Sequence, residues 1–259
     1  FIRVHLSNLL IFLKWRSKRS PIVFSKNIQT QCEELKKRGV IKINKSFLDF
    51  SNYINDFYIK NKNPPYGFLD KSNPSIGVLT NYFLNLGDPK ISAFVLDPLI
   101  VDTLHSYYGK KPLLRNDPLL QKIYGAHKNL TSSNGLFHID RYNQLSVMLL
   151  LEDVDIESTH MEYLIGSHKR KFGFFDIYLS HTNGSERMAD RHNRKGKEVF
   201  SKNKSRLYNL IGKKGDVFLF DTMGLHRAAY MPDTERKIFH LNFTNGSNLY
   251  KFQNKFPIN

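Results

Sequence analysis

The sequence predicts an α+β fold in which helices of the N-terminal half are followed by β sheets that close on each other. Two capped helix patterns lie before residue 110, whereas short apolar segments bounded by turn residues dominate from about residue 120. Hydrophobic residues make up 41% of the chain and aromatic residues 13%, which is enough for a globular interior. A length of 259 residues suits a single domain, since barrels and sandwiches reach this size.

The first helix is predicted from its two ends. Ser25 is a suitable N-cap, and Gly39 follows a last turn that carries three basic residues, which suit the negative end of a helix. A short strand over residues 40–43 is expected next. This pattern gives a helix from about residue 25 to residue 38.

A second helix is marked in the same way. Residues 61–77 are rich in Asn, Pro, Gly and Ser, and they predict a loop that separates the opening unit from the rest of the chain. Asp97 then caps a helix with Pro98 in its first turn, and Gly109 ends it. We therefore expect residues 1–119 to be mainly helical.

The second half is predicted to contain the main sheets. Its apolar segments have the length of strands and are bounded by turn residues, at residues 145–151, 162–165, 216–220 and 237–243. Residues 120–259 would then form the sheet core, interrupted by a basic insertion at 169–214.

Charge indicates an anionic partner without naming it. Lys and Arg outnumber Asp and Glu by 39 to 23, a formal net charge of +16, and residues 169–214 alone carry thirteen Lys or Arg against four Asp or Glu. Nucleic acid, a phospholipid surface, and a phosphorylated or carboxylated substrate all fit this charge. A solvated basic loop that aids solubility fits it equally well.

Two features bear on the location of the protein. Cys32 is the single cysteine and can form no internal disulfide, so a reducing, cytoplasmic setting is expected. Residues 9–13 form an apolar run flanked by basic residues, far shorter than the ~20 residues that a membrane-spanning helix needs. That run predicts a helix packed on the domain or, less in keeping with its length, a basic amphipathic helix at a membrane surface.

One triplet could hold a metal ion. His138 and Asp140 are two residues apart in an extended segment, so their side chains point the same way. His226 follows the predicted strand at 216–220 and would supply a third ligand from the far end of that strand. Two imidazoles and one carboxylate on one face leave three coordination positions open, an arrangement that suits ferrous iron and oxygen chemistry.

The triplet alone decides nothing. Ten histidines and fifteen aspartates would give about 0.6 such triplets by chance, and the pair His160 and Glu162 has the same spacing. Arg236 adds weight, because it lies ten residues after His226 and opens the last predicted strand. Its guanidinium could hold a carboxylate through two parallel hydrogen bonds, which a lysine cannot reproduce.

The chain resembles the phytanoyl-CoA dioxygenase-like family of iron and 2-oxoglutarate-dependent oxygenases. Five ordered stretches carry the likeness: the opening helix and strand, a helix that ends in Tyr-Tyr-Gly, the His-Ile-Asp metal strand with the strand after it, a Gly-Ser-His-Lys turn, and a Gly-Asp strand followed by Gly-x-His. They lie at residues 35–48, 97–112, 137–154, 163–169 and 215–227. Five matches in order are much harder to obtain by chance than one triplet.

The resemblance implies a double-stranded β-helix, the jelly-roll or cupin-like core, with the helices of the N-terminal half packed on one sheet. It also implies Fe(II) bound by His138, Asp140 and His226, 2-oxoglutarate as cosubstrate with its far carboxylate on Arg236, and O2 as the oxidant. His168, in the Gly-Ser-His turn, is interpreted as a structural residue.

Some positions depart from the family pattern. Ile165 stands where proline is usual, and Ala228 stands where a small hydroxyl residue often assists the cosubstrate carboxylate. Gln121 or Tyr124 could supply that help, although ordinary core or surface polarity explains them as well.

The expected activity is hydroxylation of a small or medium-sized substrate, with release of succinate and CO2, because Asp140 fills the position that a halide would need for halogenation. The resemblance implies a small-molecule substrate, anionic if charge is the guide, rather than nucleic acid. Two alternatives remain: a jelly-roll that has lost catalysis and binds nucleic acid or a membrane through its basic face, and a cupin-like metal enzyme that does not use 2-oxoglutarate.

Overall fold

The computed structural model describes most of the chain between residues 23 and 245. The described residues are 23–60, 79–84, 86–115, 117–124, 137–140, 143–169, 204–229, 231 and 233–245. Within them lie the helices α2 (Lys26–Arg38), α3 (Leu48–Lys60), α4 (Pro89–Val95) and α5 (Pro98–Tyr108), with short 3-10 helices η3 (Ser167–Lys169) and η4 (Lys204–Arg206). The predicted loop at 61–77, the apolar run at 9–13 and the greater part of the basic insertion lie outside the described residues.

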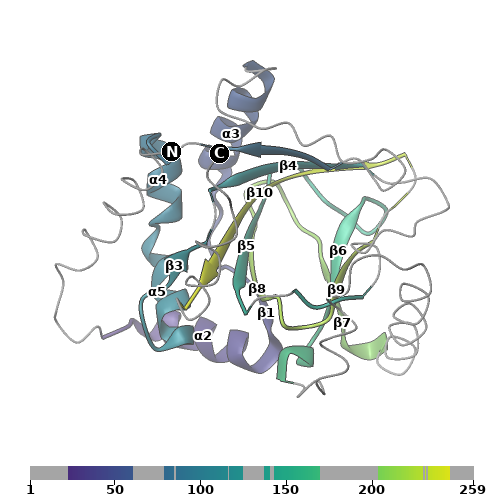
Figure 1. The fold of residues 1–259 in the computed structure, drawn as a ribbon. Helices are drawn as coiled ribbons and strands as arrows, with labels where there is room; N and C mark the ends of the chain where they lie inside the picture. Colours follow the sequence, from purple (N-terminus) through teal and green to yellow (C-terminus); the bar gives the residue numbers. More distant parts are fainter. Residues whose placement is uncertain are drawn as a thin grey trace, which may run out of the picture.

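Two antiparallel sheets form the centre of the fold (Figure 1). The larger has the order β1-β8-β5-β10-β4-β2, with β3 also paired to β10, and consists of β1 (Val40–Lys42), β2 (Leu79–Phe83), β3 (Leu113–Leu114), β4 (Leu119–Tyr124), β5 (Leu145–Leu150), β8 (Val217–Asp221) and β10 (Glu235–Thr244). The smaller has the order β7-β6-β9, with β6 (His160–Leu164), β7 (Leu207–Leu210) and β9 (His226–Ala229). Strands that neighbour each other come from distant parts of the chain, as in a jelly-roll.

The two predicted helices begin and end at their capping residues. Ser25 and Asp97 accept hydrogen bonds from backbone N–H groups in the first turns of α2 and α5. Gly39 and Gly109 end these helices with φ of +81° and +67°, a conformation that glycine adopts without strain. The Gly39 N–H also bonds the Leu35 carbonyl at 2.7 Å. Both helix predictions are confirmed.

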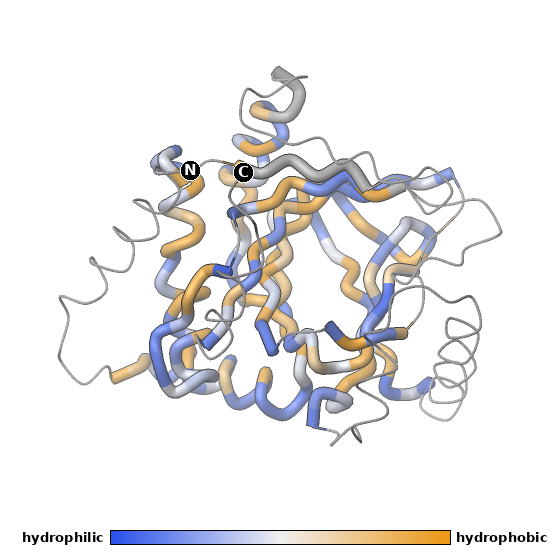
Figure 2. The backbone as a smooth tube through the Cα atoms, viewed as in Figure 1, coloured by the Kyte–Doolittle hydropathy of each residue, from blue (hydrophilic) through white to orange (hydrophobic). Residues whose placement is uncertain are grey.

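The larger sheet is buried on both faces, and its two faces contact different partners. In β5 every residue is buried. Val147 and Leu149 belong to the cluster that packs against the helices, whereas Met148 and Leu150 belong to the cluster that packs against the smaller sheet. Because side chains alternate along a strand, one run of apolar residues serves both cores. Figure 2 shows the result as hydrophobic strands throughout the centre of the molecule.

The molecule therefore has three layers. Figure 1 shows α4 and α5 on one side of the larger sheet and the smaller sheet on the other, with α2 crossing below. An aromatic cluster joins the helical layer to the sheet: Phe50 of α3 stacks on Phe94 of α4 at 4.3 Å between ring centroids, and Phe239 of β10 meets both rings edge-on. This arrangement confirms the α+β prediction with helices packed on one sheet.

The first half of the chain is less purely helical than predicted. Strands β1, β2 and β3 all lie before residue 119, and all three pair within the larger sheet. Strand β2 pairs with β4 at the edge of that sheet, so residues 79–83 become extended through a partner that lies about forty positions later. Among the described residues, no helix is long and apolar enough to cross a membrane.

Candidate metal centre

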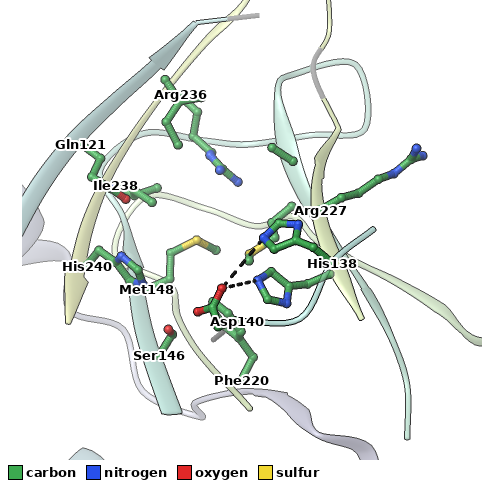
Figure 3. A pocket seen from close by; sticks show the side chains of 14 residues that line it. Gln121, His138, Asp140, Ser146, Met148, Phe220, Arg227, Arg236, Ile238 and His240 are labelled. Atoms are coloured by element: carbon green, nitrogen blue, oxygen red, sulfur yellow. Dashed lines mark ion pairs between the residues drawn. The ribbon is translucent and has the colours of Figure 1, made fainter. Parts of the chain in front are cut away.

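Three side chains that are distant in the sequence meet between the two sheets. The ligand atoms offered by His138, Asp140 and His226 all lie within 4.8 Å of one another. Asp140 Oδ1 lies 3.6 Å from His226 Nε2 and 3.9 Å from His138 Nε2. Figure 3 shows His138 beside Asp140, with dashed lines for these ion pairs. The structure thus brings together all three candidate ligands.

Main-chain hydrogen bonds create this proximity. His138 and His226 exchange both of their backbone hydrogen bonds, each N–H donating to the partner carbonyl at 3.0 Å. The Asp140 N–H donates to the Thr222 carbonyl at 2.9 Å. Residues directly opposite in such a pair have Cα atoms about 5.5 Å apart. The short segment that carries His138 and Asp140 is therefore joined by main-chain hydrogen bonds to the turn and strand that carry His226.

The position of His226 differs in one respect from the prediction. The sequence placed it at the far end of the strand that is now β8. In the structure it begins its own strand, β9, in the smaller sheet, so the chain crosses from one sheet to the other through residues 222–225. The crossing is held by the Ser167 hydroxyl, which accepts from the Leu225 N–H at 2.7 Å, and by the Tyr163 hydroxyl, which donates to the Asp221 carbonyl at 2.9 Å.

The ring of His226 is oriented for binding through Nε2. Its Nδ1 lies 2.8 Å from the Gly224 carbonyl oxygen, which can only accept, so the proton is assigned to Nδ1. This assignment leaves the lone pair of Nε2 directed at the carboxylate side of the site. A histidine ligand is commonly held in this way, with the second nitrogen donating to a carbonyl.

Asp140 is held so that a single oxygen faces the histidines. Gln144 Nε2 donates to Asp140 Oδ2 at 2.8 Å, and Arg115 Nη1 donates to the oxygen of the same Gln144 side chain. The arginine fixes the orientation of the amide, since only its oxygen can accept that bond. Oδ2 is thereby occupied and Oδ1 is presented to the metal position. The carboxylate is set up as a monodentate ligand.

The electrostatics fit a site that binds a cation. Burial alone would raise the pKa of Asp140, but the hydrogen bond and charge of His226, with His138 and Gln144, hold it below its usual range. Burial alone would lower the pKa of His226, and Asp140 raises it above the usual value. The carboxylate is therefore ionised at neutral pH. It stabilises the protonated form of His226, and a metal ion bound between the two side chains would replace that proton.

These residues line a cavity of about 160 Å³ between the sheets. Arg236 of β10 lines the same cavity with only 3% of its surface exposed, and Figure 3 shows its guanidinium directed inward across from the candidate ligands. Gln121 of β4 also lines the cavity, opposite Ile238 of β10. Tyr124 lies at the end of β4, but its side chain falls outside what the structure describes. Ala228 lines the cavity as well.

The rival pair serves other contacts. His160 Nδ1 lies 2.7 Å from the Ser158 carbonyl, and Glu162 accepts a hydrogen bond from Arg227. Among the described residues, neither belongs to a potential metal cluster, and neither lines the cavity. His168 lies in η3 against the end of α2, with Nε2 3.0 Å from the Lys36 carbonyl. That position is a packing contact rather than a place in the cavity.

Several residues of the site were not predicted from the sequence. Gln144 and Arg115 reach Asp140 through side-chain hydrogen bonds, and His240 lines the cavity from β10. The spacing of four residues between Asp140 and Gln144 is not distinctive by itself. Strand alternation could have indicated His240, because it lies on the same face of β10 as Arg236.

The donor set fits a ferrous ion. Two imidazole nitrogens and one carboxylate oxygen on one side of a site form the facial arrangement of non-haem iron oxygenases, with the remaining positions open. Zinc is more often held by four protein ligands in structural sites, and magnesium and calcium prefer oxygen ligands throughout. His138 and His226 are therefore poor ligands for the hard cations and good ligands for iron.

No protein-family model matches the chain, and no curated protein matches it. Solved structures do match. The non-haem α-ketoglutarate-dependent epimerase SnoN from nogalamycin biosynthesis is 12% identical, with a TM-score of 0.59 over 84% of this chain and 82% of SnoN. EctD from S. alaskensis with bound Fe is 16% identical, with a TM-score of 0.57 over 87% and 80% of the two chains. HygX from Streptomyces hygroscopicus, with nickel and 2-oxoglutarate bound, is 14% identical, with a TM-score of 0.54 over 85% and 87%.

The chain has the jelly-roll fold of these proteins. The fold prediction is thereby confirmed by the structural match as well. Some of the similar structures are enzymes that depend on α-ketoglutarate, which is 2-oxoglutarate. At such low identities the likeness concerns the fold. The chemistry of the site depends on its own residues.

Proposed function

We propose that this protein is a non-haem Fe(II) and 2-oxoglutarate-dependent oxygenase of the phytanoyl-CoA dioxygenase-like family. His138, Asp140 and His226 hold the iron. The observation that carries the proposal is the meeting of these three side chains in one cavity that Arg236 also lines. A metal triad alone would suit many reactions, whereas a buried arginine facing it selects a cosubstrate with a carboxylate.

The cavity has a separate role for each polar group. Arg236 binds the far carboxylate of 2-oxoglutarate through its planar guanidinium. Gln121, which lines the cavity from the neighbouring strand, assists that carboxylate where Ala228 offers no hydroxyl. The apolar side chains of Ile123, Met148 and Ile238 line the same cavity and give it an apolar wall.

The iron supplies oxidation of a C–H bond by O2, coupled to conversion of 2-oxoglutarate into succinate and CO2. The chain's part is to bind the cosubstrate, to keep coordination positions open and to place the target carbon. Because Asp140 supplies an oxygen to the metal, no place is left for a halide, and hydroxylation is the outcome we propose. The substrate is a small or medium-sized molecule, and the net charge of +16 favours an anionic one.

The proposal extends to the organisation of the chain. We propose one oxygenase domain over residues 1–259, with the insertion at 169–214 as the source of much of the positive charge. A cytoplasmic setting fits the lone Cys32, which is buried and not in a disulfide.

The test needs no substrate. Ferrous iron and 2-oxoglutarate are added under anaerobic conditions, and the weak visible charge-transfer band of the chelated complex is followed. We expect the band in the wild type and its loss in His226→Ala. In Arg236→Ala the affinity for 2-oxoglutarate should be at least tenfold weaker than in the wild type, and in Arg236→Lys it should lie between these two values. Lys237→Ala is the matched control, because Lys237 is the next cation on β10 and pairs with Glu152 and Glu235 rather than lining the cavity.

Each alternative has its own result. A metal enzyme without 2-oxoglutarate predicts that Arg236→Ala loses no activity and that no band forms. A binding module predicts steeply salt-dependent affinity for polyanions, with no iron-dependent formation of succinate. Either result contradicts the oxygenase proposal.

A further inference from the structure

His240 is a polar side chain in the cavity to which the proposed chemistry gives no role. It lies on β10, four residues after Arg236 and two after Ile238, and these three side chains line the same cavity. Figure 3 shows His240 beside Met148, across the cavity from His138. Its position is set by strand alternation, which places residues 236, 238 and 240 on one face of β10.

The ring of His240 is held in a mainly apolar place. It lies nearly parallel to the ring of Phe220, with an interplanar angle of 7° and ring centroids 6.5 Å apart. Its Nε2 atom is buried and has no hydrogen-bond partner among the residues that the structure describes. A buried polar atom left without a partner is energetically unfavourable. Such an atom at the wall of a cavity is a candidate contact for whatever fills the cavity.

The ring is neutral at physiological pH. Burial lowers the pKa of His240 to about 4, with Asp140 opposing that shift and with Arg236 and His226 adding to it. A neutral imidazole carries one N–H and one lone pair. In the tautomer with the proton on Nε2, the ring offers the cavity a single hydrogen-bond donor without adding a charge.

The geometry of β10 indicates which part of a ligand this donor meets. Four residues of strand span roughly 13 Å, so Arg236 and His240 lie at two ends of the cavity wall. The candidate metal ligands lie nearer the His240 end. Gln144, which donates a hydrogen bond to Asp140, directly precedes β5, and Met148 of β5 is paired with His240. A five-carbon diacid anchored by one carboxylate on Arg236 would thus bring its other end, the end that meets the metal, to His240.

We propose that His240 is a cosubstrate-binding residue whose Nε2–H donates a hydrogen bond to the metal-proximal carboxylate of 2-oxoglutarate. The inference rests on the proposed function and deepens it. Arg236 then recognises one end of the diacid with a charge, and His240 recognises the other end with a neutral donor. A neutral donor at that end strengthens binding without drawing the carboxylate away from the metal, as a second arginine would.

The test uses ferrous iron and 2-oxoglutarate under anaerobic conditions, with the visible band as the readout. His240→Phe keeps a ring beside Phe220 and removes the donor. We expect it to weaken 2-oxoglutarate binding about tenfold, the loss of one hydrogen bond to a charged group, and to shift the band. In His240→Gln the side-chain amide takes the place of Nε2–H, and affinity should return to within about threefold of the wild type.

His160→Phe is the matched control, because His160 also has a buried Nε2 without a partner in the described part of the chain but does not line the cavity. The affinity for Co(II) without 2-oxoglutarate reports whether each variant keeps its fold, and His240→Leu makes the same comparison if the Phe ring does not fit. Wild-type affinity and an unshifted band in His240→Phe would overturn the role of His240 alone. Absence of any band in the wild type would overturn the proposed function, and this inference with it.

Discussion

At the scale of single residues, the site depends on groups behind the ligands as much as on the ligands themselves. Gln144 holds one oxygen of Asp140, and Arg115 orients Gln144. The Gly224 carbonyl similarly selects the tautomer of His226. These contacts determine which atoms face the metal before any metal arrives, which reduces the reorganisation that binding requires.

Removing the Gln144 amide should loosen the metal. Gln144→Leu keeps the volume but releases Asp140 Oδ2, and we expect metal affinity to fall about 10-fold to 100-fold, as is usual when such an outer contact is lost. Titration with Co(II) measures it. Ser146→Ala is the control, since Ser146 lines the same cavity but donates to Asn242 rather than to Asp140. Equal affinities in the two variants would contradict the role of Gln144.

Metal affinity should also depend on pH through His226. The raised pKa of His226 means that its protonated form is stabilised in the metal-free fold, whereas the lowered pKa of Asp140 keeps that group ionised well below pH 3.8. The pairing therefore stabilises the metal-free protein above pH 3.8 and is lost as pH rises through the raised pKa of His226. Below that pKa a metal must displace one proton, so affinity should fall about tenfold per pH unit. Titrations from pH 8 to pH 5 check this, and a flat profile would refute it.

At the scale of elements, glycine at a helix end does more than stop the helix. Gly39 ends α2 with φ of +81°, and a side chain there would collide with the Tyr163 hydroxyl and the His168 ring. Tyr163 in turn holds the carbonyl of Asp221, just before the crossing to β9. The end of α2 therefore packs against Tyr163, which holds the segment that leads to His226.

Gly39→Ala should cost more stability than Gly109→Ala. Both glycines have positive φ, which costs other residues roughly 1–2 kcal/mol, but a Cβ at Gly109 meets nothing within 4 Å. We expect Gly39→Ala to lower the melting temperature by several degrees more than Gly109→Ala, and to weaken metal binding as well. Thermal unfolding followed by circular dichroism measures the difference. Equal losses would show that the Tyr163 contact is unimportant.

Local signals at the ends allowed two helices to be predicted, whereas α4 was missed although Asp88 and Pro89 mark its start in the same way. Elements that only the fold creates were missed as well. Helices α2 and α5 were predicted because capping is a property of a few adjacent residues. Helix α3 was missed because its start carries no such cap, and its burial comes from packing Ile54 and Phe50 into the core. Strand β2 was missed because only pairing with β4 makes it extended.

The same division holds for the candidate site. A family pattern was enough to select His138, Asp140, His226 and Arg236, because their order and spacing are visible in the chain. Gln144 follows from no local pattern. Alternation places His240 on the same face of β10 as Arg236, but its place in the cavity depends on the register between strands. The choice of these residues as iron and cosubstrate ligands remains a prediction, and the geometry supplies its strongest support.

At the scale of the whole molecule, the metal position lies where segments of the two sheets are joined by main-chain bonds. His138 bridges to β9 of the smaller sheet, and Asp140 is bonded to Thr222, which follows β8 of the larger. A bound ion would add a link between these parts, and binding to the folded state alone stabilises it by mass action.

Metal and cosubstrate together should therefore raise the melting temperature. At a hundred times its dissociation constant a ligand adds about 2.7 kcal/mol, which corresponds to several degrees for a chain of this size. Mn(II) with 2-oxoglutarate avoids oxidation during the scan. His226→Ala is the control, and an equal shift in that variant would place the binding elsewhere.

The reciprocal hydrogen bonds between the main chains of His138 and His226 hold these two positions together independently of their side chains. The peptide groups set the spacing of the two positions, and every residue except proline has both the N–H and the C=O that these bonds use. The imidazole side chains take no part in these main-chain bonds. A descendant of this gene could exchange either ring for another side chain, lose the proposed activity, and still reach its native shape. Loss of the proposed activity and loss of folding are thus expected to be separate events for this protein.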